Sequence, residues 1–234
     1  MFLFMTQYNT AMSKQQSMGK CNLCGEITGH AFMTRHLSAC RQPEASRRLP
    51  ASEKRPPAPS FHLAIEGRDA KAYWMHVAVP LTAPLSKLDD FLRHTWLECC
   101  GHLSAFEIGS KRYASQPMDE EMSMKAQLSQ VFEVGTKFFY EYDYGSTTAL
   151  VLKVVGLREQ GLPKGGVQLL ARNEAPQVSC QRCGIQPATQ ICAECAWNGE
   201  GWLCEACAVA HECGDEMCLP VVNSPRVGVC GYTG

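Results

Sequence analysis

The 234-residue sequence predicts an α+β protein with a cysteine-rich module on either side of its central domain. Stretches that alternate apolar and polar residues recur through the middle of the chain, and short segments of helical spacing lie between them. The fourteen cysteines lie almost entirely outside that middle region. We therefore expect an antiparallel or mixed sheet with helices on one face, an N-terminal ββα-like zinc finger and a C-terminal cross-brace zinc module.

Charge and composition divide the chain into segments. The net charge is +5 over residues 1–60, −2 over residues 61–175 and −4 over residues 176–234. A basic start and an acidic end favour different partners for the two ends. The predicted segments are an unstructured start (1–19), a zinc finger (20–41), a basic proline-rich linker (42–60), an α+β domain (61–175) and a two-zinc cysteine-rich module (176–234).

The cysteines favour metal binding over disulfides, because no secretory signal accompanies them. The apolar start "MFLFM" lacks a basic flank and a small-residue cleavage site, so it is not expected to be a signal peptide, and the true start is taken as Met12 or Met18. No run of about 18 apolar residues occurs, so no membrane span is expected. We expect a cytoplasmic protein.

The stretch "CNLCGEITGHAFMTRHLSAC" has the ligand pattern of a zinc finger. Two cysteines two residues apart form a tight knuckle, and a histidine and a cysteine four apart share one face of a helix that starts near Thr28–Gly29. The spacing resembles that of a classical ββα finger whose last histidine is a cysteine. Ile27 and Met33 are expected to pack beneath the metal. The predicted ligands of this zinc are Cys21, Cys24, His36 and Cys40.

The same finger is a candidate for nucleic-acid contact. In DNA-binding fingers, exposed helix positions contact bases, and a single finger covers only about 3 bp. The proline-rich linker adds cations that can hold phosphates with strong salt dependence. The alternative is a solvated linker beside a structural or protein-binding finger. The candidate contact residues for DNA or RNA, all within residues 20–60, are His30, Thr34, Arg35, Arg47, Arg48, Lys54 and Arg55.

The middle domain is predicted to have the element order ββαββαβββ. "FHLAIEG" and "AYWMHVAV" form a first hairpin, and "APLSKLDDFLRHTWLECC" forms a helix that Gly101 ends. Ser86 and Asp89 are a candidate capping box for that helix. "LSAFEIG" and "KRYAS" form a second hairpin, and the acidic "PMDEEMSMKAQLSQVF" ends in a short helix. The last strands are "TKFFYEYDYG", "TTALVLKVVGLRE" and "GVQLLARNE".

Residues 61–172 resemble the plasmid pRiA4b ORF-three-like family, which includes passenger proteins of some insertion sequences. The marks of the resemblance are Trp96, the segment from His102 to Phe106, and the turn Tyr142-Asp143-Tyr144-Gly145. The resemblance implies a compact α+β domain of unsettled function. Many members continue the turn with Asp, then Trp and His. This chain instead has Ser146, Thr147, Thr148 and Leu150, so any activity carried by that polar set is not expected here.

Catalysis is not expected in the middle domain. His94, Cys99, Cys100, His102 and Asp143 are the candidates for a Cys–His dyad or a further metal site. On a continued helix, Cys99 and Cys100 point to different faces, so at most one is expected to join any site. Asp143 in a tyrosine-rich turn most simply accepts hydrogen bonds from backbone amides. The sequence contains no nucleophile elbow, phosphate loop or paired-carboxylate motif.

Three CxxC knuckles follow one another in the tail, with eight residues between one and the next. With a later histidine and cysteine they supply eight ligands, enough for two zinc ions. The segment resembles cross-brace modules of the B-box and MYND type without matching either spacing. In a cross-brace, alternate knuckles share a metal: Cys180, Cys183, Cys204 and Cys207 hold one zinc, and Cys192, Cys195, His211 and Cys213 hold the other.

Two alternatives to this arrangement stay open. In a sequential arrangement the first two knuckles share one metal and the later ligands share the next, and Cys218 can take the place of Cys213. Cys230 is expected to pack rather than to bind metal. Zinc is expected to supply most of the stability of this module. The apolar residues that either form a protein-binding patch or dock on the middle domain are Trp197, Trp202 and Val209.

These observations predict a protein with three zinc ions and no enzymatic activity. The favoured function is a nucleic-acid-associated or adaptor protein, linked to a mobile element, that contacts nucleic acid through its basic head and a protein through its middle and tail. The alternative is a protein-interaction module in which all zincs are structural. A third hypothesis, an enzyme that uses the Asp143 turn, requires the candidate catalytic groups to share an open pocket.

Overall fold

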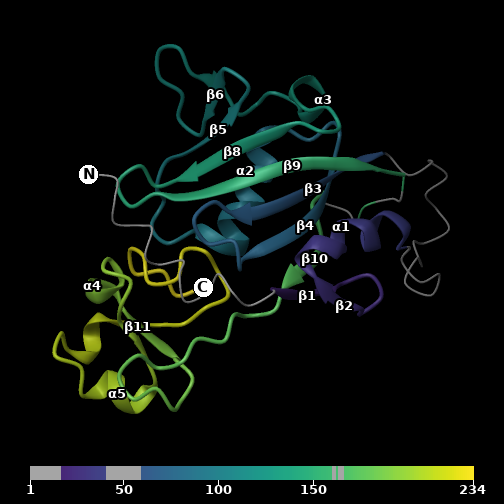
Figure 1. Ribbon diagram of the computed structural model, residues 1–234. Coiled ribbons are helices and arrows are strands. Elements are labelled where there is room, and N and C mark those ends of the chain that lie inside the picture. Colours follow the sequence, from purple (N-terminus) through teal and green to yellow (C-terminus); the bar gives the residue numbers. More distant parts are fainter. Residues whose placement is uncertain (1–16, 41–58, 160–161, 163–165) are drawn as a thin grey trace, which may run out of the picture.

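The computed structural model describes residues 17–40, 59–159, 162 and 166–234. A ten-stranded sheet dominates the described part of the chain (Figure 1). Its strands are β1 (Met18–Cys21), β2 (Ile27–Gly29), β3 (Ser60–Gly67), β4 (Trp74–Pro80), β5 (Ser104–Ile108), β6 (Lys111–Ala114), β7 (Met122–Ser123), β8 (Lys137–Tyr142), β9 (Thr148–Arg158) and β10 (Gln168–Asn173). The spatial order is β2-β1-β10-β4-β3-β9-β8-β5-β6-β7.

The expected α+β class is confirmed, and the sheet is mixed because β6 and β7 pair in parallel while the other neighbours are antiparallel. A second sheet in the tail has the order β12-β11-β13, with β11 (Gln190–Cys192), β12 (Trp202–Leu203) and β13 (Cys218–Pro220). The helical elements are α1 (His30–Ala39), α2 (Leu85–Leu92), the π-helical turn η2 (Arg93–Leu97), α3 (Leu128–Val131), α4 (Ala193–Ala196), α5 (Glu205–Val209) and the 3-10 turn η3 (Asp215–Met217). None of the described helices is long and apolar enough to cross a membrane.

The two faces of the central sheet carry different helices. Successive strand residues point to opposite faces. Phe61, Leu63 and Ile65 of β3 belong to the main hydrophobic core, which also contains the buried leucines of α2. Trp74 and Ala78 of β4 belong instead to a second cluster with residues of α1. The expectation of helices on one face therefore holds for α2, while α1 of the finger covers part of the opposite face.

The predicted segments implied that the finger is a separate unit. In the structure it extends the central sheet instead. Strand β1 pairs antiparallel with β10, and Gly19 lies opposite Asn173. Residues 18 and 19, expected in the unstructured start, belong to this strand. Met33 is buried as expected, but Ile27 is 49% exposed because it lies on the edge strand β2, and Leu37 takes its place in the core.

The helix α2 starts without the expected capping box, because Pro84 occupies the N-cap position and no side chain caps the helix. Asp89 is buried instead. Its carboxylate accepts hydrogen bonds from Ser104 Oγ and Tyr140 Oη, each at 2.7 Å, and from Arg93 Nε at 3.0 Å. These bonds fix the end of the helix against β5 and β8, and the helical stretch ends at Leu97 before the predicted stop.

The last residues of the chain, 221–234, run back onto the α+β domain, and we call them the C-terminal strap. Val227 is buried in the main core together with Ile191 and Trp202 of the tail module. The Ser224 hydroxyl donates a 2.5 Å hydrogen bond to the backbone carbonyl of Trp96. The tail therefore shares its hydrophobic core with the domain, in agreement with the docking alternative for Trp202.

Candidate metal centres

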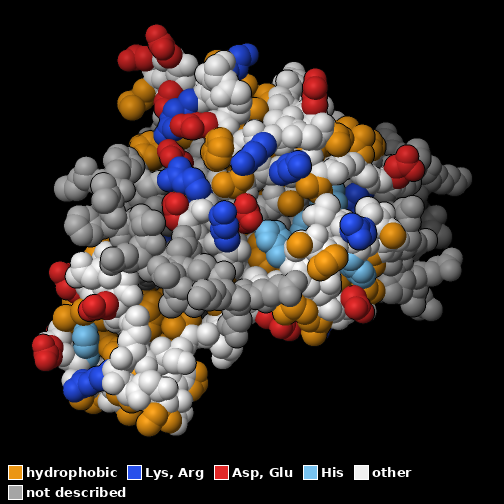
Figure 2. All heavy atoms as spheres, in the orientation of Figure 1, with side chains coloured by type: hydrophobic (Ala, Val, Ile, Leu, Met, Phe, Trp, Pro, Cys, Tyr) orange, Lys and Arg blue, Asp and Glu red, His pale blue; other side chains and the backbone are white. Residues whose placement is uncertain are grey.

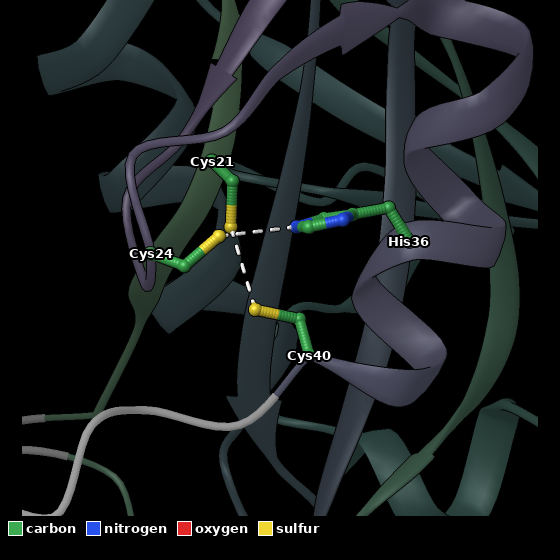
Figure 3. Close-up of side chains that lie close together, drawn as sticks. All are labelled: Cys21, Cys24, His36 and Cys40. Atoms are coloured by element: carbon green, nitrogen blue, oxygen red, sulfur yellow. Dashed lines mark hydrogen bonds between the residues drawn. The ribbon is translucent and has the colours of Figure 1, made fainter.

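The first Cys/His cluster lies where β1, the following turn and α1 meet (Figure 3). Cys21 and Cys24 come from the knuckle, which is closed by a hydrogen bond from the Gly25 amide to the Cys21 carbonyl. His36 and Cys40 come from the last turn and the C-cap of α1. Cys24 Sγ lies 3.4 Å from His36 Nε2, and Cys21 Sγ lies 3.9 Å from Cys40 Sγ. All four predicted ligand atoms lie within 4.8 Å of one another.

The tail contains two further clusters in the interleaved order. Cys195 Sγ lies 3.4 Å from His211 Nε2 and 3.7 Å from Cys213 Sγ, and Cys183 Sγ lies 3.9 Å from Cys204 Sγ. The structure thus groups these residues as a cross-brace and not sequentially. The two sets are Cys180, Cys183, Cys204 and Cys207, and Cys192, Cys195, His211 and Cys213.

The backbone explains why alternate knuckles meet. The Gln181 amide donates to the Trp202 carbonyl, which places the first knuckle beside the third. Cys192 ends β11, and the next residue begins α4. Cys218 lies opposite Cys192 across the β11–β13 pair but belongs to neither cluster. Cys213 therefore completes the second set, and Cys218 does not.

A fourth cluster contains three of the candidates for a further metal site and one residue that was not a candidate: Cys99, Cys100, His102 and Cys230 bring their ligand atoms within 4.8 Å of one another. One expectation is wrong here. Cys99 and Cys100 both join the cluster, because the helical stretch ends at Leu97 and both residues lie in the loop beyond it. Cys230, expected to pack rather than to bind metal, also lies in the cluster, because the C-terminal strap returns to that loop. The sequence signal was present in the adjacent cysteines and the histidine, but the fourth member comes from the far end of the chain.

Asp143 and Arg226 lie beside this fourth cluster. Asp143 has a positive φ of 66°, and its Oδ1 accepts from the amides of Gly145 at 3.0 Å and Ser146 at 3.2 Å, which confirms the predicted amide contacts. Its Oδ2 lies 2.8 Å from Arg226 Nη2 and 3.5 Å from His102 Nε2. Burial raises the pKa of the carboxyl, but the hydrogen bonds from Arg226 and the two amides outweigh it and lower the pKa.

His94 lies apart from these groups, since its exposed ring bonds the Asp90 carbonyl through Nδ1 at 2.6 Å. Of the five candidate catalytic residues, His94 therefore lies apart, whereas Cys99, Cys100, His102 and Asp143 lie close together. A pocket with a volume of about 250 Å³ lies between α1 and the end of β9, apart from these groups.

The pKa values of the clustered cysteine thiols indicate that a positive charge would lie among them. Burial raises the pKa of Cys180, but backbone amides including those of Cys183 and Cys204 outweigh it and bring the pKa to about 6. Burial and the neighbouring thiols of Cys192 and Cys213 raise the pKa of Cys195 to about 12. Thiols held this close cannot all ionise unless a positive charge lies among them, and a bound divalent metal supplies that charge.

The candidate nucleic-acid residues have different surroundings. His30 stacks on Trp74, with ring centroids 4.8 Å apart and an interplanar angle of 12°. Thr34 is half-buried and lines the pocket beside α1, whereas Arg35 is exposed. The linker residues Arg47, Arg48, Lys54 and Arg55 lie outside the described residues.

Two buried histidines beneath the finger were missed at the sequence level. His62 and His76 lie in the two strands predicted as the first hairpin, and they are only 4% and 0% exposed. His62 Nε2 lies 3.0 Å from His76 Nδ1. Burial is the largest cause that lowers their pKa values, to about 4 for His62 and about 3 for His76. The sequence could not show that α1 covers this face.

The fold and the clusters define an α+β domain with candidate metal centres at both ends. The chain belongs to the plasmid pRiA4b ORF-3-like protein family, whose model matches residues 60–181. No curated protein matches the chain. A solved structure of a protein of unknown function from Methanosarcina mazei Go1 is 18% identical, with a TM-score of 0.42, and the match covers 49% of this chain and 68% of that one.

Proposed function

We propose that this protein is a non-enzymatic adaptor in which the three sequence-predicted clusters hold zinc. Soft thiolates with imidazole are ligands that zinc prefers, and a tetrahedral zinc with bonds of about 2.3 Å to sulfur places the sulfurs about 3.8 Å apart. The sulfur separations of 3.7 to 3.9 Å in these clusters fit that arrangement. The fit supports a metal held in each cluster by protein groups alone.

The observation that carries the non-enzymatic proposal is that each cluster supplies four protein ligands. A catalytic zinc site keeps one position open for water or substrate, whereas a structural site is closed by four ligands. Closed sites that hold the finger and the tail module together internally support a scaffold. On this proposal the protein acts through its surfaces, and the zincs hold those surfaces in place.

The tail module carries the surface that we assign to a protein partner. Ile185 is 82% exposed and Val209 is 74% exposed. Arg182 donates a hydrogen bond to the Ala210 carbonyl, which joins the knuckle that carries Ile185 to the end of α5 that carries Val209. Trp197 of the same module is 51% exposed, while Trp202 is buried. The acidic charge of the tail favours a partner with apolar and basic groups.

Nucleic-acid association is the second candidate, and one observation favours it, on the part of the sheet face opposite α2 that α1 leaves exposed. Lys137 of β8 and Lys153 of β9 are exposed and directly opposite each other. Like charges in that position destabilise a sheet, so an anion would relieve their repulsion. Lys137 lies over the exposed ring of Phe139, with its Nζ 5.8 Å from the centroid, and such rings can stack bases. Figure 2 shows Lys and Arg side chains over this part of the molecule.

This second candidate would extend to Arg35 and the linker cations, and it suits a mobile-element setting. Base reading by the finger helix itself is disfavoured. His30 is stacked on Trp74 and Thr34 is half-buried, so two of the three helix positions that would face bases contact this chain instead.

The test of the adaptor is native mass spectrometry of the full chain purified from its host without added metal. We expect at least three zinc ions and a bound protein that the variant Ile185→Ser/Val209→Ser loses while it keeps its zinc. Absence of zinc, or of any partner that depends on these two residues, would contradict the proposal.

The nucleic-acid candidate needs a separate titration with labelled duplex DNA and single-stranded RNA at two salt concentrations. If this candidate is right, the affinity of the wild type for nucleic acid falls as the salt concentration rises. At one salt concentration, the affinity is lower than that of the wild type in Lys137→Ala/Lys153→Ala or in the linker variant Arg47→Ala/Arg48→Ala/Lys54→Ala/Arg55→Ala. The control is Lys71→Ala/Lys125→Ala, which removes two other exposed lysines. Equal affinity in all four proteins, or no binding, excludes this candidate.

A further inference from the structure

We propose that Cys99, Cys100, His102 and Cys230 form a fourth zinc site, which latches the C-terminal strap onto the α+β domain. Three of these residues lie in the loop between η2 and β5, and Cys230 lies near the end of the strap. A metal held by all four would join segments about 130 residues apart. The proposal shares its zinc chemistry with the proposed function but needs no partner and no nucleic acid.

The sulfur–sulfur distances in this cluster match those in the three predicted ones, and its sulfur–nitrogen distances are slightly shorter. Cys100 Sγ lies 3.7 Å from Cys99 Sγ, 3.9 Å from Cys230 Sγ and 3.0 Å from His102 Nε2. His102 Nε2 lies 3.3 Å from Cys230 Sγ. The predicted clusters have sulfur–sulfur separations of 3.7 to 3.9 Å and sulfur–nitrogen separations of 3.4 Å. The fourth cluster thus has the spacing of a four-ligand metal site.

A disulfide does not account for these positions. A disulfide bond is about 2.0 Å long, far shorter than any sulfur–sulfur separation here. Thiols are weak hydrogen-bond donors and acceptors, so hydrogen bonding among them gives little reason to gather three cysteines and a histidine. Cys230 also has a φ of 51°, in the left-handed region that residues other than glycine seldom adopt. Such a conformation persists where surrounding interactions impose it.

The surroundings of the cluster are those of a built thiolate site. Arg226, fully buried, places its Nη2 3.4 Å from Cys99 Sγ, where it can donate a hydrogen bond to a thiolate. A zinc with three thiolates and one neutral imidazole has a net charge of about −1, and Arg226, which also pairs with Asp143, offsets part of it. Arg226 and Cys230 both come from the strap, so one segment supplies a ligand and the positive charge beside it.

Exposure distinguishes this site from the other three. Each predicted cluster contains at least one buried cysteine, whereas none of the four ligands here is buried, and Cys100 and Cys230 are exposed. Water and chelators reach it most easily, so its zinc is the first to leave. Release would remove the tie at Cys230, while Ser224, Val227 and the buried Tyr232 still contact the rest of the fold, which makes the site a releasable latch.

The test is a zinc count on the full chain by native mass spectrometry under reducing conditions, with Cys230→Ser as the variant. The matched control is Cys218→Ser, since Cys218 is the one cysteine of this chain that belongs to none of the four clusters. We expect four zincs in the wild type, three in Cys230→Ser and four in Cys218→Ser. Three zincs in both the wild type and Cys230→Ser would overturn the latch, as would four in Cys230→Ser.

If Cys230→Ser folds poorly, hydrogen exchange of the wild-type protein tests the fourth site instead. Wild-type protein is treated with increasing chelator, and hydrogen exchange is followed in the strap. The first zinc to leave should raise exchange in residues 228–234 while α1 and β11 stay protected. If the first loss deprotects α1 or β11 instead, the latch is excluded. A wild type without any zinc would contradict the proposed function as a whole, whereas one with only three contradicts the fourth site alone.

Discussion

Arg226 of the C-terminal strap places Nη2 2.8 Å from Asp143 Oδ2, and this ion pair joins the strap to the turn between β8 and β9. The guanidinium is fully buried, and its Nη1 also donates to the Ser146 carbonyl and the Thr148 hydroxyl, each at 3.1 Å. The guanidinium carbon Cζ of Arg226 lies 4.8 Å from the ring centroid of Tyr142. A buried charge with this many partners fixes the position of the strap.

Replacing Arg226 with methionine should destabilise the fold strongly. The change keeps most of the side-chain volume but leaves the buried carboxylate of Asp143 without its cation, and such losses cost about 3–5 kcal/mol. Urea unfolding in the presence of zinc measures the effect. The matched control is Arg68→Met, which breaks exposed ion pairs with Asp69 and Glu141 and should cost less than about 1 kcal/mol. Equal losses in the two variants would contradict the structural role of Arg226.

Paired cysteine substitutions in the tail should distinguish the two zinc connectivities. Cys183→Ser/Cys207→Ser removes two ligands of one cross-brace site, so one zinc should be lost from the wild-type count. Cys183→Ser/Cys195→Ser removes one ligand from each site, so two zincs should be lost. A sequential arrangement reverses these results, because the first two knuckles would then share a metal. The zinc content of the purified variants, measured by native mass spectrometry, decides between them.

The stability of the fold should fall as the pH drops from about 6.5 toward 4. The pKa values of His62 and His76 are lowered to about 4 and about 3, so in this range the unfolded chain binds protons that the folded chain does not. Unfolding therefore takes up protons, and each histidine contributes a slope of up to about 1.4 kcal/mol per pH unit.

Chemical unfolding at a series of pH values measures this slope. The variant His62→Gln/His76→Gln should show a smaller slope than the wild type. Protonation of metal ligands also lowers stability in acid, and comparison with the variant removes that contribution. His94→Gln, which replaces a histidine at an exposed position, is the control for the substitution itself. A slope unchanged in the double variant would show that the buried pair does not titrate as described.

Gly19→Ala should loosen the finger from the sheet. A Cβ at this position would lie 2.4 Å from the Trp74 ring and 2.5 Å from the Arg172 carbonyl oxygen, so β1 could not keep its place beside β10. Overpacking of this kind costs about 1–3 kcal/mol. Hydrogen exchange of α1 reports the loosening. Gly156→Ala is the control, because a Cβ there meets no atom within 4 Å, and it should leave α1 protected.

The sequence determined the pieces whose ligands or periodicity are local. The knuckles, the His36–Cys40 pair on one helix face and the alternating strands all follow from spacings of a few residues, and the structure places them as expected. The even distance between the tail knuckles also favoured the interleaved grouping that the structure has. In each case the partners are close in sequence or repeat at a regular interval.

The tertiary structure decided what depends on contacts between distant segments. Only the pairing of β1 with β10 shows that the finger extends the sheet, and only then do His62 and His76 become buried. The fourth cluster needed the return of the strap, which brings Cys230 to Cys99 and Cys100. Side-chain patterns report which face of an element is apolar. They do not report which distant segment will cover the other face, because that choice depends on the packing of the whole chain.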